Sequence, residues 1–172
     1  YAIAKIAGLK LCSYMFKEHK KDCITVMPTN LYGPNDNFDL NTSHVLAALI
    51  NKITHAKKHK KKAVEIWGSG RPKRDFLHVT DLADAICFLA ENYSSPDPVN
   101  IGSSKEISIE DLAKIIAKLV GWNGSFIYNK AMPDGTMLKK LDTTKIKKMG
   151  WRPLIDIKTG IEDTIKEYIK LI

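Results

Sequence analysis

CITVMPTNLYGPNDNFDLNTSH, residues 23–44, joins a short apolar run to a long polar stretch, and this change of character indicates the fold. Residues 23–28 are apolar and β-branched and end at Pro28, as expected of a buried strand in a parallel sheet. Residues 29–44 are rich in Asn, Asp, Gly and Pro, which predicts a loop, and loops of this length are usually functional. The stretch therefore predicts a parallel sheet with a functional loop after one strand.

Helical and strand patterns alternate around this stretch. Apolar residues at helical spacing predict helices over residues 2–19, 43–57, 81–93, 109–121, 143–150 and 158–172. Residues 64–79 predict two strands joined by a Gly-rich turn, residues 99–102 and 125–128 predict two more, and residues 131–142 predict a loop. No repeat of fixed period and no disordered linker is present, which indicates one folded piece of α/β class.

Polar residues and glycine mark the helix ends. Thr80 and Asp142 are expected to cap the helices that follow them. Ser108 with Asp111 matches a capping box, and Gly121 is expected to end that helix.

The composition is that of a globular, basic chain. Its 172 residues are 44% hydrophobic, enough to bury a core, and its net charge of +8 favours an anionic partner. Five lysines lie in HAKKHKKK, residues 55–62, which could form a nucleic-acid or membrane-surface patch. A solvated helix end is favoured instead, because no aromatic residues interleave the lysines as a stacking platform requires. We therefore expect no nucleic acid partner.

Cys12, Cys23 and Cys87 have spacings that suggest neither a disulfide framework nor a metal site, so reduced core thiols are expected and no metal is predicted. No apolar run reaches the ~18 residues of a membrane span and no secretory signal opens the chain. These observations predict a cytoplasmic location and no membrane partner.

YAIAK, residues 1–5, places a phenol and an ammonium four residues apart. On a helix Tyr1 and Lys5 share a face, and a neighbouring cation stabilises a phenolate, so the pair could be a proton donor with a tuned pKa. The alternative is two polar residues on the solvated face of a helix.

A dinucleotide-binding α/β chain needs a Gly-rich turn of G-x-G-x-x-G type between a strand and a helix, because only glycine lets backbone N–H groups approach the pyrophosphate. None of the ten glycines forms that pattern. Either the protein binds no dinucleotide, or the binding half lies upstream of Tyr1.

Three blocks favour the second alternative. YAIAK, VMPTNLYGP and WGSG with Arg74 and Asp75 resemble the extended short-chain dehydrogenase/reductases that act on nucleotide sugars. MPTNLYGPNDNFDLNTSHV and PDGTMLKKLD resemble, within that superfamily, the GDP-L-fucose synthase family. The similarity runs through the whole chain but matches only the later half of the family's enzyme. It implies C3/C5 epimerisation and then NADPH-dependent C4 reduction of GDP-4-keto-6-deoxymannose.

The resemblance also implies catalytic roles. Tyr1 would protonate the C4 oxygen, Lys5 would bind the nicotinamide ribose and lower the tyrosine pKa, and His44 would be the acid of the epimerisations. A lone histidine near a helix start is otherwise structural. The residues implied to bind NADP(H) are Tyr1, Lys5, Pro28, Thr29, Asn30, Leu31 and His44.

The residues implied to bind the GDP-sugar are Lys52, Trp67, Arg74, Asp134 and Lys139. Arginine can fork onto diphosphate oxygens, lysine adds a point charge, and tryptophan offers a flat face to guanine or ribose. Core packing of the tryptophan and solvated surface charges are the alternatives. The chain departs from the family at Lys52, where arginine is expected, at Met137, where proline is usual, and at Leu138, where a basic residue is expected.

The implied architecture is the remainder of a Rossmann-type doubly wound parallel sheet interleaved with a small α/β sugar-nucleotide domain. Residues 1–41 and 76–103 are assigned to the cofactor domain, and residues 42–75 and 104–172 to the substrate domain. The Gly-rich half is expected upstream, so this chain alone is expected to be inactive. A homodimer is implied, for which the apolar residues of the first helix could supply a face.

Two alternatives remain open. One is another nucleotide-sugar epimerase or dehydratase of the same superfamily. The other is a non-catalytic nucleotide or nucleic-acid binding module that uses residues 55–62, which strongly salt-dependent DNA binding would favour.

Overall fold

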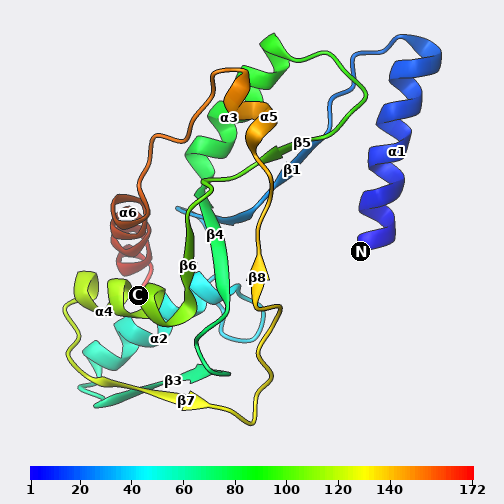
Figure 1. Ribbon diagram of the computed structural model, residues 1–172. Helices are drawn as coiled ribbons and strands as arrows, with labels where there is room; N and C mark the ends of the chain where they lie inside the picture. The colour runs from blue at the N-terminus through cyan, green and yellow to red at the C-terminus, as the bar shows by residue number, and fades with distance from the viewer.

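The computed structural model describes residues 1–172 as an α/β fold (Figure 1). Its helices are α1 (Ala2–His19), α2 (Val45–Lys58), α3 (Val79–Asn92), α4 (Ile109–Val120), α5 (Thr144–Lys148) and α6 (Ile157–Lys170). Its strands are β1 (Val26–Pro28), β2 (Asn30–Tyr32), β3 (Ala63–Trp67), β4 (Lys73–His78), β5 (Val99–Ile101), β6 (Glu106–Ser108), β7 (Ser125–Asn129) and β8 (Leu138–Lys139). The predicted fold class is confirmed.

Strand pairing is mainly parallel. β1 pairs with β5, β2 with β4, and β3 with β7, all in parallel. β4 is the most connected strand, since its first residues also pair with antiparallel β6 on one side and with parallel β8 on the other. Everything attached to β4 is therefore positioned by one strand.

The predicted loop over residues 29–44 is wrong at its start. Leu31 and Tyr32 lie in β2 and pair with Leu77 and His78 of β4. Tyr32 is only 2% exposed and Leu31 is half-buried, so packing of these two large side chains outweighs the loop-forming composition around them.

The strands in residues 64–79 are present, but they do not form a hairpin. β3 pairs with β7 and β4 with other strands, because the turn between β3 and β4 redirects the chain. Gly68 and Gly70 in that turn have φ of 73° and 74°, which glycine adopts without strain. The predicted loop over residues 131–142 likewise contains the two-residue strand β8.

The helix caps agree with the sequence except at α3. Ser108 Oγ accepts a hydrogen bond from the Asp111 N–H at 3.0 Å, and Gly121 ends α4 in the left-handed conformation. An Asp142 carboxylate oxygen accepts from the Thr144 N–H at 2.9 Å. Thr80, however, lies inside α3, whose cap is the ring of His78.

The buried residues form two cores. The larger contains 21 residues, mostly from α2, α4 and α6, and the smaller contains seven, around α3, β5 and α5. Consecutive residues of β4 point to opposite sides, so Phe76 belongs to the larger core and Leu77 to the smaller. β4 is therefore shared by both.

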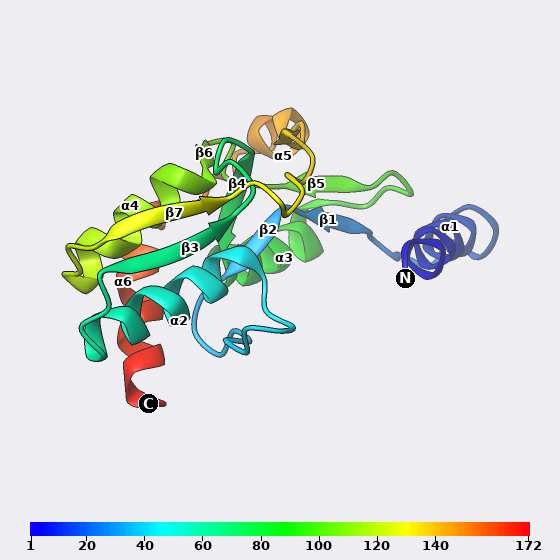
Figure 2. The same ribbon diagram turned by 90° about the horizontal axis from the view of Figure 1, so that it is seen from below.

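Helix α1 stands apart from this body in both views (Figures 1 and 2). It has no buried residue, and Ile3, Ile6 and Leu11 are exposed.

The prediction of core cysteines is wrong, because Cys12 and Cys23 are only partly buried and Cys87 on α3 is exposed. All three are free thiols, as expected. No helix is long and apolar enough to cross a bilayer.

Replacing Ile116 with alanine should destabilise the larger core strongly. Its side chain is fully buried on α4, so the substitution should lower the free energy of unfolding by about 2–5 kcal/mol through lost transfer energy and a cavity. Urea unfolding followed by circular dichroism measures the change. Ile86→Ala is the matched control, since Ile86 is an isoleucine on α3 that is 41% exposed. Equal losses for the two variants would contradict the core assignment.

Candidate functional site

Arg74 on β4 lies beside the loop that precedes β8. Its Nη1 donates hydrogen bonds to the backbone oxygens of Thr136, at 2.5 Å, and Lys73, at 2.8 Å. A Cβ on Gly135 would lie 2.9 Å from Nη2, so the loop passes close to the guanidinium. The Nε and Nη2 donors have no hydrogen-bond partner within the chain, and Lys139 is the residue paired with Arg74 on β8. Arg74 is thus fixed at one nitrogen and open at the others, as an anion-binding arginine should be.

Trp67 ends β3 with its side chain in solvent. The residue is 57% exposed, so the core alternative is excluded. Lys52 Nζ lies 5.1 Å from the centre of the ring and donates to the backbone oxygen of Glu65 at 3.3 Å. The indole N–H donates to the Glu65 carboxylate at 3.1 Å. An exposed aromatic face beside an ammonium group suits a base or ribose attached to phosphate.

Asp134 is engaged within the chain. Its two carboxylate oxygens accept hydrogen bonds from the backbone N–H of Ser69, at 2.8 Å, and from the Ser69 hydroxyl, at 2.7 Å. These hydrogen bonds hold the pKa of Asp134 below its usual value. The carboxylate therefore fastens the loop before β8 to the turn after β3. Its contact with a ligand stays a prediction.

The segment after β1 reaches β4 through two polar side chains. The Thr29 hydroxyl and the Asn30 amide both donate to the backbone oxygen of Asp75, at 3.1 Å and 2.7 Å. Pro28 is exposed at the carboxyl end of β1, and Leu31 is half-buried in β2. The carboxyl ends of parallel strands are where α/β proteins bind cofactors, so this segment fits the nicotinamide end of a dinucleotide.

Tyr1 and Lys5 lie side by side, as the helical spacing predicts. Lys5 Nζ is 5.4 Å from the centre of the Tyr1 ring, and Tyr1 is 97% exposed. Tyr1 directly precedes α1 and Lys5 lies in its first turn. Helix α1 stands apart from the strands (Figure 2).

His44 is the exposed residue before the first turn of α2. Burial raises the pKa of nearby Asp36, and the charge of His44 acts in the opposite direction. His44 makes no hydrogen bond or ion pair with another predicted site residue. The structure therefore gathers Arg74 and Lys139 on paired strands with Trp67 and Asp134 around the adjoining turn. No hydrogen bond or ion pair joins the Tyr1 and Lys5 pair, or His44, to this group.

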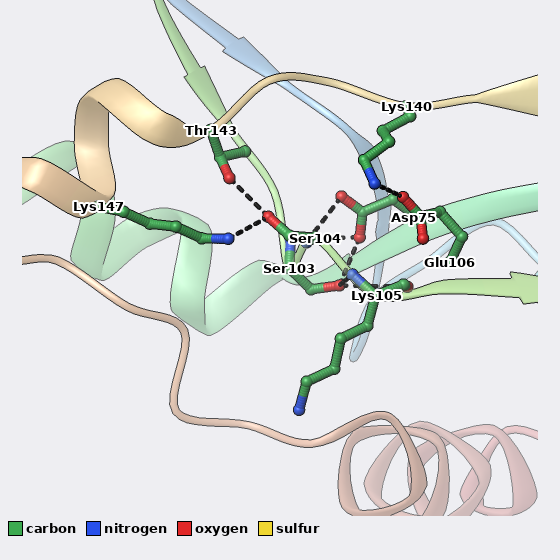
Figure 3. Close-up of polar contacts among 8 residues, drawn as sticks. All are labelled: Asp75, Ser103, Ser104, Lys105, Glu106, Lys140, Thr143 and Lys147. Carbon is green, nitrogen blue, oxygen red and sulfur yellow. Dashed lines mark hydrogen bonds and ion pairs between the residues drawn. The ribbon is translucent and has the colours of Figure 1, made fainter.

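Sequence reasoning assigned no role to Asp75, which lies at the centre of a polar network (Figure 3). The carboxylate is fully buried and accepts hydrogen bonds from the turn between β5 and β6. The only signal in the sequence is its position directly after Arg74.

The family model for the NAD dependent epimerase/dehydratase family matches residues 1–102, more than half of the chain. The chain belongs to this family. Among curated members, GDP-L-fucose synthase 1 of Arabidopsis thaliana is 46% identical over 170 residues, which cover 99% of this chain and 53% of the relative. The chain is thus a homologue of GDP-L-fucose synthases, as the sequence motifs predicted. It spans about half the length of the curated relatives it matches.

Solved structures of similar proteins have the same fold. A GDP-L-fucose synthetase from Naegleria fowleri matches 99% of this chain and 54% of its own with a TM-score of 0.91 and 28% identity, and it has also been solved bound to NADP. A GDP-6-OMe-4-keto-L-xylo-heptose reductase from C. jejuni matches 99% of this chain and 60% of its own, with a TM-score of 0.90 and 31% identity. Structural relatives therefore bind NADP.

Proposed function

We propose that the full-length protein is a GDP-L-fucose synthase, which epimerises GDP-4-keto-6-deoxymannose at C3 and C5 and then reduces C4 with NADPH. The observation that carries the proposal is the open guanidinium of Arg74 beside Lys139, in a chain that is 46% identical to such synthases. Two neighbouring cations suit a ligand with a diphosphate at its centre.

The substrate side of the site uses adjoining elements. Arg74 forks onto one phosphate through its unpartnered nitrogens, and Lys139 adds a point charge next to it. Trp67 stacks on guanine or ribose, with Lys52 at the edge of the ring. Because Lys52 stands where the family has arginine, its contact is a single point charge and not a fork.

The cofactor side uses Pro28, Thr29, Asn30 and Leu31 at the strand ends, together with Tyr1, Lys5 and His44. NADPH, when bound, supplies the hydride for C4. Tyr1 gives a proton to the oxygen at C4, and Lys5 favours the phenolate that remains. His44 returns a proton to the sugar ring during epimerisation, since an imidazole exchanges protons near neutral pH.

The domain assignment and the dimer belong to the same proposal. The two cores support two lobes, but the cores do not follow the proposed domain boundaries. Ile146 and Trp151, assigned to the substrate domain, pack in the smaller core with Leu77 and Val99 of the cofactor domain. The exposed apolar residues of α1 support a role in homodimer assembly. The cytoplasmic location stays a prediction.

A second candidate is the reduction of a different GDP-4-keto sugar. The match to the C. jejuni heptose reductase favours it, since that protein shares the fold at 31% identity. Turnover of GDP-4-keto-6-deoxymannose compared with a GDP-4-keto-heptose by the full-length protein decides between them.

Replacing Arg74 with alanine in the full-length protein should weaken GDP-sugar binding selectively. Loss of a charge-assisted hydrogen bond costs ~1.5–3 kcal/mol, so KM and the GDP inhibition constant should rise roughly ten- to a hundredfold while NADPH affinity is unchanged. Initial rates and GDP titration measure both. Lys73→Ala is the matched control, because Lys73 is an exposed cation on the opposite face of β4. Unchanged GDP affinity in Arg74→Ala would assign Arg74 to the surface.

A further inference from the structure

Asp75 holds the turn between β5 and β6 to strand β4 (Figure 3). One carboxylate oxygen accepts hydrogen bonds from the N–H of Ser103, at 3.2 Å, and from the Ser103 hydroxyl. The other accepts from the N–H of Ser104 at 3.2 Å. A Cβ on Gly102 would lie 2.5 Å from this second oxygen, so the turn approaches the carboxylate as closely as glycine permits.

This carboxylate is fully buried and forms no ion pair. Burial raises its pKa, and the hydrogen bonds from Ser103 and Ser104 act in the opposite direction. Lys140 forms its ion pair with Glu106, at 2.5 Å, and acts on Asp75 only through its longer-range charge. A buried carboxylate without a directly paired cation is costly to desolvate, so the hydrogen bonds from Ser103 and Ser104 are the contacts that keep it in place.

The turn that Asp75 holds is tied on its far side to the segment after β8. Ser104 has a φ of 61°, in the left-handed region, and its hydroxyl lies 2.5 Å from the Thr143 hydroxyl and accepts from Lys147 Nζ at 2.6 Å. The Lys140 pair with Glu106 adds a second tie between the same segments. The chain that carries Lys139 is thus fastened to β4 both by strand pairing and through this turn.

The backbone of Asp75 also contacts the segment proposed to bind the cofactor. Its backbone oxygen receives the hydrogen bonds of Thr29 and Asn30, and its chain neighbour is Arg74. One residue therefore joins the segment proposed for nicotinamide to the two cations proposed for diphosphate. Because the Asp75 side chain has no exposure to solvent, it cannot touch a substrate itself.

We propose that Asp75 is a positioning residue that sets the placement of Arg74 and Lys139 relative to Thr29 and Asn30. The inference rests on the proposed function, because it concerns the same sugar-nucleotide site. Without the carboxylate anchor, the turn and the segment after β8 shift relative to β4, and the two cations no longer match a diphosphate.

A double-mutant cycle between Asp75 and Arg74 in the full-length protein tests this. Asp75→Asn keeps the size and the backbone oxygen but turns an N–H₂ toward backbone donors, so we expect GDP affinity to fall about three- to tenfold. In an Arg74→Ala background the same change should lower GDP affinity by a clearly smaller factor, about twofold or less, because only Lys139 is left to be positioned. Ser125→Ala, a serine on β7 far from the network, should leave affinity unchanged.

Ser103→Ala provides a milder variant in the same cycle. It removes the hydroxyl contact to Asp75 and leaves both backbone contacts, and it decides the question if Asp75→Asn does not fold. The positioning role is overturned if the substitution lowers GDP affinity by the same factor with Arg74 present and in the Arg74→Ala background. It is also overturned if GDP affinity does not fall in either background. If Arg74→Ala alone leaves GDP affinity unchanged, the proposed substrate site fails, and the positioning role fails with it.

Discussion

Tyr1→Phe in the full-length protein should lower NADPH turnover by roughly 10²- to 10⁴-fold, the usual contribution of a positioned general acid. The phenol is the proposed proton donor to the C4 oxygen, and phenylalanine keeps the ring without the proton. Solvent deuterium should still exchange into C3 and C5 of the substrate, because proton transfer at those carbons does not use the phenol.

NADPH absorbance and deuterium uptake, measured on the same samples in D₂O, report the two steps separately. Tyr14→Phe is the matched control, since Tyr14 is an exposed tyrosine within α1, the helix that Tyr1 precedes. Parent turnover in Tyr1→Phe would remove the phenol from the mechanism.

His44→Gln should have the opposite pattern. Glutamine keeps polarity at the start of α2 but cannot carry a proton, so proton return at C3 or C5 should stall by a similar 10²- to 10⁴-fold. Hydride transfer would remain possible, and the variant should slowly release a GDP-6-deoxy sugar of the wrong configuration.

Product configuration by NMR and deuterium uptake measure this change. His55→Gln is the control, since His55 is an exposed histidine within α2, the helix that His44 precedes. Formation of GDP-fucose at the parent rate with both protons exchanged would make His44 a structural residue.

Most elements of the fold could be predicted from local pattern. The amphipathic spacing of α4 and its Ser108 and Gly121 ends are encoded within a few residues, so they were found. β2 was missed because Leu31 and Tyr32 become a strand only through pairing with β4, more than 40 residues away. The cap of α3 was misplaced because an imidazole took the role expected of Thr80.

The candidate site divides in the same way. Arg74, Trp67 and Lys139 were predicted from family motifs, and the structure places them on adjoining elements. Asp75 had no assigned role, because its burial depends on Gly102 and on a turn formed by residues 103 and 104. Contacts of that kind depend on tertiary structure and leave no local periodicity.

Since Phe76 and Leu77 put one strand into both cores, opening of either core is expected to disturb the packing of the other. Loss of either core would remove the side-chain packing on one face of β4 and weaken its pairing with β2, β6 and β8. Opening events large enough to expose β4 amides should therefore be rare and should involve both halves, whereas α1 can fray alone. A substrate bound by Arg74 and Lys139 would accordingly lie against strands that stay paired.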